Sequence, residues 1–360
     1  MDYQLIKPLI FRLPAEAAHS MAIRALKLGL TGVVERSTRT VLKQRLWNLD
    51  FQSPIGLAAG FDKNAEVPDA ILKLGFGFTE CGTITPKPQA GNPKPRIFRL
   101  IRDRAVINRL GFNNKGLEEA ASRLEERKRQ GCYGIVGANV GANKTSEDHI
   151  ADYVTCLDRL AGLAQYFVVN ISSPNTPGLR ALQSKQSLTE LVTKVLTARN
   201  KAYEERNLGT PAPLLVKVAP DLTPEDIADI AAVAIEQKLD GLIISNTTIE
   251  RPETLKGRKR KEAGGLSGAP LFEPSTHVLS EFYRLTEGKV PLIGVGGVSN
   301  AEQALEKIKS GASLVQIYSA LVYEGPKLAA KIADDLALLL KAQGYSNIRD
   351  AVGANHREQD

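Results

Sequence analysis

Cysteine and histidine are scarce in this chain of 360 residues, which contains three of the first and four of the second. The cysteines are Cys81, Cys132 and Cys156, an odd number without CxxC spacing, which argues against a disulfide framework and a zinc site. Such cysteine usage suits a reducing compartment. No two histidines have a metal-ligand spacing such as HxxxH, so we expect no metal centre.

Long apolar runs are also missing. No segment approaches the roughly 20 apolar residues that a membrane-spanning helix needs, and the N-terminus lacks the order of a signal peptide. Residues 1–45 carry eight basic against three acidic side chains, which is most of the net charge of +7. A basic helical segment suits an anionic membrane surface or a nucleic acid, and a solvated helical face explains it equally well. We therefore expect a protein that is soluble or lies on a membrane surface.

One unit recurs from Pro54 onward: a short apolar run, a polar or glycine-rich end, and then a helical segment. Strands that are apolar on both faces and alternate with helices indicate an all-parallel sheet. Eight such strands predict an α/β fold, the (β/α)8 TIM barrel, with a doubly wound open sheet as the alternative. The predicted strands lie at 54–60, 78–85, 133–141, 166–173, 214–220, 240–247, 291–298 and 314–320.

Helix-start signals lie between these strands. The segment that begins at Ser146 opens with this residue as the expected cap, and Thr223 precedes Pro224 at another helix start. Residues 1–40 are expected to form a small helical element, interrupted at Pro8 and Pro14, ahead of a barrel domain over 41–360.

Two insertions interrupt the repeating unit. Residues 91–116 contain alternating runs that predict a hairpin over the barrel mouth. Residues 248–268 contain the basic run 258–261, followed by GGLSG. We expect the basic run to be a solvated loop.

Polar side chains gather where the predicted strands end. In a barrel these carboxyl ends meet at one face, where active sites lie. The glycines of 294–297 and the hydroxyls of Tyr318 and Ser319 suit a phosphate held by backbone N–H groups. Ser299 stands where a dinucleotide fingerprint needs a third glycine or alanine, so a mononucleotide cofactor fits better than NAD.

Lys217 and several asparagines point to the ligand's chemistry. Lys217 lies inside an apolar strand, and an inward lysine needs an anionic or electron-rich partner, such as reduced flavin. The alternative is a side chain that extends outward to solvent. Asn108, Asn170, Asn175 and Asn246 each offer a donor and an acceptor, which suits a planar ligand with ring carbonyls and N–H groups.

These residues resemble those of the class 2, membrane-associated and quinone-dependent dihydroorotate dehydrogenases. The resembling stretches are GLAAGFDKNAE, GTITPKPQAGNPKPRIFRL, INRLGFNNKG, NISSPNTPGLR, VKVAPDLT, SNTT, GGLSG, IGVGGV and GASLVQIYS. They follow in consistent order over residues 54–326, and the N-terminal extension matches class 2 as well. The resemblance implies oxidation of dihydroorotate to orotate in pyrimidine biosynthesis, with FMN as hydride acceptor and a membrane quinone as final electron acceptor.

The resemblance also implies two sets of site residues. Ser245 departs from the threonine that relatives often carry, but it keeps the hydroxyl. For FMN the set is Ala59, Gly60, Lys63, Thr83, Asn139, Asn170, Lys217, Ser245, Gly268, Gly297, Tyr318 and Ser319. For dihydroorotate it is Lys63, Asn108, Arg109, Leu110, Gly111, Phe112, Asn170, Asn175, Asn246 and Thr247.

The catalytic base implied by the resemblance is Ser173, where cytosolic class 1 enzymes carry cysteine. It would take a proton from C5 of the substrate while the hydride at C6 passes to the flavin. Pro174 and Pro177 would restrict the loop and keep the serine within reach. A relay through Thr176 and a water beside Phe112 is our hypothesis for its activation.

Two other functions have a basis in the sequence. A flavin barrel that reduces uridine in transfer RNA would explain the positive charge, but it needs a cysteine acid, and only Cys81 lies near a strand's polar end. A basic membrane scaffold without catalysis would leave the asparagines unexplained.

We therefore expect no nucleic acid partner. We expect a peripheral protein on the cytoplasmic side of an anionic cell membrane, and we expect residues 1–40 to be its quinone-access element.

Overall fold

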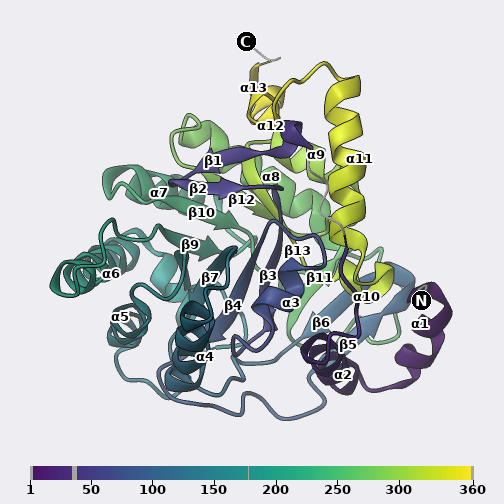
Figure 1. The fold of residues 1–360 in the computed structure, drawn as a ribbon, viewed down its shortest axis with the longest axis horizontal. Coiled ribbons are helices and arrows are strands. Elements are labelled where there is room, and N and C mark those ends of the chain that lie inside the picture. Colours follow the sequence, from purple (N-terminus) through teal and green to yellow (C-terminus); the bar gives the residue numbers. More distant parts are fainter. Residues whose placement is uncertain (1–2, 35–38, 177, 358–360) are drawn as a thin grey trace.

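The structure, a computed structural model, describes residues 3–34, 39–176 and 178–357. Eight parallel strands close into a barrel in the order β10-β12-β13-β3-β4-β7-β8-β9 (Figure 1). The strands are β3 (Ile55–Asp62), β4 (Phe78–Ile84), β7 (Ile135–Val140), β8 (Tyr166–Asn170), β9 (Leu214–Val218), β10 (Gly241–Ile244), β12 (Leu292–Val295) and β13 (Ala312–Ile317). All eight predicted strands are confirmed, and closure of the sheet excludes the open alternative.

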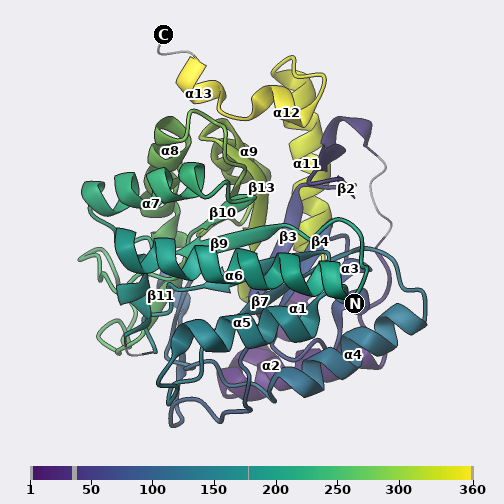
Figure 2. The same cartoon turned by 90° about the vertical axis from the view of Figure 1, so that its left-hand side faces the viewer.

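Helices cover the outside of the barrel, and Figure 2 shows α7, α6, α5 and α4 following one another around it. This ring contains α3 (Pro68–Leu72), α4 (Leu117–Arg129), α5 (His149–Leu160), α6 (Lys185–Glu205), α7 (Pro224–Glu236), α8 (Phe272–Leu285), α9 (Ala301–Lys309) and α11 (Leu328–Ala342). Three shorter helices, α10 (Ala320–Glu324), α12 (Ile348–Ala351) and α13 (Ala354–Arg357), lie toward the C-terminus.

Of the two predicted helix caps, one is confirmed and one is wrong. Thr223 forms a complete capping box at the start of α7, as expected. The prediction for α5 was wrong, because Asp148 rather than Ser146 accepts the hydrogen bond from Ala151 N, at 3.0 Å. Ser146 instead donates to the carbonyl of Asp148.

A short hairpin covers the amino-terminal end of the barrel. It consists of β1 (Gln44–Leu46) and β2 (Leu49–Phe51), and the indole of Trp47 donates to Asp240 O at 2.7 Å. Phe51 packs edge-on against Phe78 inside the barrel, where Tyr166 is also buried. Aromatic rings therefore fill this end, and the polar residues at the strand ends lie at the other.

A three-stranded antiparallel sheet, in the order β11-β6-β5, lies at the mouth of the barrel. Its strands β5 (Ile97–Leu100) and β6 (Ala105–Asn108) form the predicted hairpin. The third strand, β11 (Gly265–Gly268), comes from the second insertion and was not predicted. The two insertions therefore form one structural unit.

The N-terminal segment forms two helices, α1 (Tyr3–Arg12) and α2 (Ala15–Lys27). Glu16 of α2 forms an ion pair of 2.6 Å with Arg96 beside the mouth sheet. The expected interruption at Pro8 was wrong, since Pro8 lies inside α1, whereas Pro14 directly precedes α2. No helix of the described ranges is long and apolar enough to cross a membrane.

Helix capping gives a first test. We expect Asp148→Ala to lower the free energy of unfolding by about 1 kcal/mol, because it removes the side-chain acceptor at the start of α5. Ser146→Ala is the matched control and should change it by less than about half of that. Chemical denaturation of both variants measures the difference. If Ser146→Ala loses more unfolding free energy than Asp148→Ala, Ser146 is the cap of α5, as the sequence predicted.

Candidate functional site

One cavity of about 500 Å³ extends from the barrel mouth to helices α1 and α2. Its wall contains the predicted residues Ala59, Gly60, Lys63, Thr83, Asn108, Leu110, Gly111, Phe112, Asn170, Ser173, Asn175, Lys217, Ser245, Asn246, Thr247, Gly268, Gly297, Tyr318 and Ser319. Residues from both predicted sets thus share a single space. Its far part is apolar and contains Ile6, Ile10, Ala18 and Ala22 of the N-terminal helices.

Two predicted residues lie outside this wall. The guanidinium of Arg109 faces away from the cavity, pairs with Glu262 at 2.8 Å and stacks on the ring of Phe98. Its side chain therefore joins the two insertions. Asn139 is fully buried inside the barrel, where its Oδ1 accepts a hydrogen bond from Thr83 at 2.7 Å.

Three asparagine amides and a carboxylate form a chain of hydrogen bonds. Asn139 donates to Glu80 at 3.3 Å and accepts from Asn170 at 3.3 Å. Asn170 in turn accepts from Asn246, again at 3.3 Å. Because a carboxylate can only accept, Glu80 sets the orientation of Asn139, and each amide then orients the next. The donors and acceptors of the mouth are therefore fixed before any ligand arrives.

The sequence reasoning missed Glu80. Its side chain is fully buried and also accepts hydrogen bonds from Tyr166, at 3.2 Å, and from Gln316. A charged residue in the middle of the apolar run FTECGTIT is the same signal that singled out Lys217, and it could have identified Glu80.

Lys217 points into the cavity from β9 and is only 5% exposed. Among the described residues, no hydrogen bond or ion pair reaches its ammonium group. Burial lowers the pKa of Lys217, while the charge of Glu80 acts in the opposite direction. The outward alternative is wrong, and a cation in this position suits an electron-rich ligand.

The wall near β12 and β13 suits a phosphate. Gly297 has φ of 75°, and a Cβ atom there would lie 2.6 Å from the backbone nitrogen of Phe272, at the start of α8. Only glycine allows this close approach of the two backbones. The hydroxyls of Ser267 and Ser319 lie 2.8 Å apart beside it. Backbone N–H groups and hydroxyls are the donors that phosphates prefer.

Ser173 lies in the loop after β8 and is 5% exposed. Its hydroxyl accepts a hydrogen bond of 3.3 Å from Asn175 N, and no histidine or carboxylate in the described part of the chain bonds to it. The side chain of Asn175 reaches the hairpin by donating to Asn108 O at 3.3 Å. Pro177, expected to restrict this loop, lies outside the described residues.

Lys63 and His19 stand between the polar and apolar parts of the cavity. Lys63 donates to Gly60 O at 2.6 Å, and burial lowers its pKa to about 8. His19, which the sequence did not single out, packs edge-on against Phe61. Burial and the charge of Lys63 lower the pKa of His19 to about 3, so its ring is neutral at physiological pH.

Comparison with known proteins points to one family. A family model described as dihydroorotate dehydrogenase matches residues 41–340. A dihydroorotate dehydrogenase (quinone) of Rhodospirillum rubrum is 53% identical over 356 residues, which are 99% of this chain and 95% of that protein. One of Brucella anthropi is 56% identical over 339 residues, 94% of this chain and 92% of that protein. The crystal structure of an Eimeria tenella dihydroorotate dehydrogenase in complex with ferulenol has a TM-score of 0.92 at 43% identity, covering 95% of this chain and 96% of that one.

The buried carboxylate gives a second test. In Glu80→Gln one acceptor oxygen becomes a donor, and one of the three donors that face it loses its partner. We expect the free energy of unfolding to fall by about 1–3 kcal/mol. Glu190→Gln, which breaks an exposed pair with Lys194, should change it by about 0.5 kcal/mol or less. If urea denaturation shows the same loss of unfolding free energy in both variants, the burial of Glu80 does not add to its contribution to stability.

Proposed function

The chain belongs to the dihydroorotate dehydrogenase family, and we propose that the cavity at its barrel mouth is where dihydroorotate is oxidised to orotate with FMN as hydride acceptor. The enzyme serves pyrimidine biosynthesis, and a quinone is its final electron acceptor. The supporting observation is that one cavity joins the amide chain and Ser173 to the apolar side chains of α1 and α2. A polar substrate and an apolar electron acceptor would each find a matching part of it.

The residues of the barrel side fit FMN. Lys217, buried without a hydrogen-bond partner among the described residues, would hold the electron-rich edge of the ring system. Gly268, Gly297 and Ser319 would receive the phosphate at the opposite end of this part of the cavity. The bound flavin supplies a two-electron acceptor for the substrate's hydride.

The amide side chains would read the pyrimidine ring. Asn170 and Asn246 present donors and acceptors in fixed orientation, because the chain from Glu80 sets them. A site of this kind rejects analogues that leave its buried polar groups unpaired. Lys63 would meet the substrate carboxylate. Arg109 would make no direct contact with the substrate, since its side chain pairs with Glu262 and its backbone N–H donates to Arg96 O at 2.9 Å.

Ser173 would remove the C5 proton. The loop presents its hydroxyl to the cavity between Asn170 and Asn175, which would hold the ring on either side. Serine is a weak base and needs activation. Without a histidine or carboxylate bonded to it in the described chain, the proton would leave through the buried Thr176 and a water beside Phe112.

The direct test is anaerobic. Dihydroorotate should bleach the absorption of the bound flavin, and subsequent addition of a quinone should restore it. Absence of bleaching would refute the proposal. Binding of transfer RNA together with failure to oxidise dihydroorotate would instead favour the uridine-reducing alternative.

Ser173→Ala is the sharpest variant. It should bind orotate nearly as the wild type does but reduce flavin far more slowly, because the proton acceptor is gone. Ser173→Cys should retain part of the activity, since a thiolate can take the same proton. A flavin reduction rate in Ser173→Ala within about threefold of the wild type, less than about 1 kcal/mol of barrier, would remove Ser173 from the mechanism.

Residues 1–40 would form the quinone-access and membrane element, distinct from the barrel domain over 41–360. Parts of α1 and α2 line the cavity, and large apolar side chains are exposed on these helices and just after them. They are Leu5 and Leu9 of α1, Met21 of α2, and Leu13, Leu28, Leu30 and Val33 in the segments that follow the helices. With Lys7, Arg12, Arg24 and Lys27 nearby in sequence, such a surface suits an anionic membrane, which we propose to be the cytoplasmic side of the cell membrane.

Removal of residues 1–40 should separate the reduction of flavin by dihydroorotate from its reoxidation by quinone. A protein that starts near Val41 should keep dihydroorotate-driven flavin reduction but lose most long-chain quinone reduction and liposome binding. Leu5→Glu combined with Leu9→Glu tests the same surface in the full chain, since both side chains are exposed in α1. Unchanged quinone reduction in membranes and unchanged liposome binding would contradict the assignment.

A further inference from the structure

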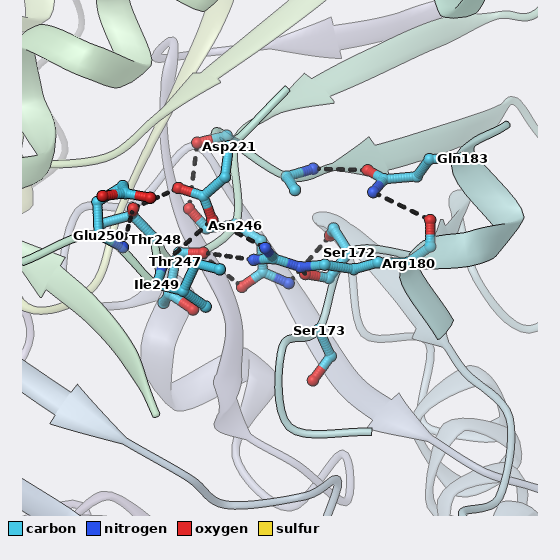
Figure 3. Close-up of polar contacts among 12 residues, drawn as sticks. Ser172, Ser173, Arg180, Gln183, Asp221, Asn246, Thr247, Thr248, Ile249 and Glu250 are labelled. Atoms are coloured by element: carbon cyan, nitrogen blue, oxygen red, sulfur yellow. Dashed lines mark hydrogen bonds and ion pairs between the residues drawn. The ribbon is translucent and has the colours of Figure 1, made fainter. Parts of the chain in front are cut away.

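The guanidinium of Arg180 joins three loops at the barrel mouth, as Figure 3 shows. It pairs with Asp221, in the loop after β9, at 2.8 Å. It also donates to Ser172 O at 3.3 Å and to Thr247 O at 3.1 Å. These carbonyls precede Ser173 in the loop after β8 and follow Asn246 in the loop after β10. A planar group with donors in a fixed fork is suited to three acceptors at once.

Asp221 extends this connection to the cover of the mouth. Its carboxylate accepts hydrogen bonds from the hydroxyl of Thr248 and from Ile249 N, the latter at 3.1 Å. Thr248 pairs through its backbone with Leu266 of β11. Asp221 therefore holds the beginning of the second insertion, whose strand completes the mouth sheet.

Gln183 attaches the short helix that contains Arg180 to the loop after β9. Its side chain accepts from Ala219 N, just after β9, at 2.9 Å and donates to Arg180 O at 3.4 Å. The short helix Leu179–Gln183, which follows the serine loop, is thus attached to the barrel at both of its ends.

We propose that Arg180 and Asp221 are positioning residues that hold the Ser173 loop against the loop of Asn246 and Thr247. This inference rests on the proposed function of Ser173 as base. Among the described residues, the one other side-chain hydrogen bond between the two loops, apart from the amide chain, runs from Asn246 to Ser172 Oγ, at 3.0 Å. Loss of the pair would let the serine move relative to a ring held by Asn246, and a displacement of about 1 Å costs about 100-fold in rate.

The chain offers a matched control in the ion pair of Arg199 and Asp240, at 2.7 Å. Arg199 also donates to a carbonyl, that of Ala212, and Asp240 accepts from Leu214 N. Both pairs are partly buried, with side chains 23% and 12% exposed for Arg180 and Asp221, and 12% and 33% exposed for Arg199 and Asp240. The control pair lies where β9 and β10 begin, at the opposite end of the barrel from the cavity.

Arg180→Gln, Arg180→Lys and Arg199→Gln are compared as flavin-loaded enzymes. Stopped-flow measurement of flavin reduction at saturating dihydroorotate should show a loss of about 10- to 100-fold in Arg180→Gln, a smaller loss in Arg180→Lys, and a rate within twofold of wild type in Arg199→Gln. Substrate deuterated at C5 should give a larger isotope effect in Arg180→Gln than in the wild type, because proton removal is the slowed step. Reoxidation of chemically reduced enzyme by quinone should be unchanged.

Three outcomes would overturn the inference. One is a reduction rate in Arg180→Gln that matches Arg199→Gln; another is an unchanged C5 isotope effect. The third is a rate loss in the double variant, Arg180→Gln with Asp221→Asn, that equals or exceeds the product of the two single losses, because an ion pair that both residues form can be lost only once. If Arg180→Gln does not fold, Arg180→Lys and Asp221→Asn decide by the same criteria. Failure of wild-type enzyme to reduce its flavin with dihydroorotate would refute the proposed function, whereas these three outcomes refute only the positioning role of Arg180 and Asp221.

Discussion

The carboxylate of Glu80, enclosed by the barrel, determines how the polar groups above it are arranged. It receives three hydrogen bonds and returns none, so Asn139, Tyr166 and Gln316 must all point their donors toward it. The orientation of Asn139 then passes to Asn170 and from there to Asn246. A buried charge is costly unless it is satisfied, and here the groups that satisfy it also set the pattern presented to a ligand.

The same carboxylate balances the charge of Lys217. An ammonium group buried in β9 without a hydrogen-bond partner in the described chain is disfavoured by desolvation, and the field of Glu80 offsets part of that cost. The barrel interior thus contains one acidic and one basic side chain, below a cavity that would receive an electron-rich ring. Phe51 and Phe78 at its other end need no such compensation, because their side chains bury only carbon.

Local patterns predicted the barrel well and its cover only in part. Each of the eight barrel strands was recognisable because a strand covered on both faces is apolar throughout, and the polar residues at its end mark the mouth. The pairing of β11 with β6 was not predictable, because it joins Gly265–Gly268 to Ala105–Asn108 across a long separation in sequence. The predicted cap of α5 was wrong because Ser146 and Asp148 are both good cap residues and lie two positions apart. The predicted interruption at Pro8 was wrong because α1 continues through this proline, although the residue cannot donate a backbone hydrogen bond.

The residues of the site were identified by resemblance, whereas their mutual connections came only from the structure. Glu16 of α2 pairs with Arg96 at the hairpin, and Arg109 of the same hairpin pairs with Glu262 of the second insertion. That insertion begins at the residues held by Asp221, whose partner Arg180 holds the serine loop. Three of these links are ion pairs with partly buried members, and such pairs resist separation more than exposed ones. The link from Asp221 to the second insertion consists of hydrogen bonds from Thr248 and Ile249. The N-terminal helices, the mouth sheet and the serine loop are therefore connected in series around one cavity, so its apolar and polar parts are assembled by the same set of contacts.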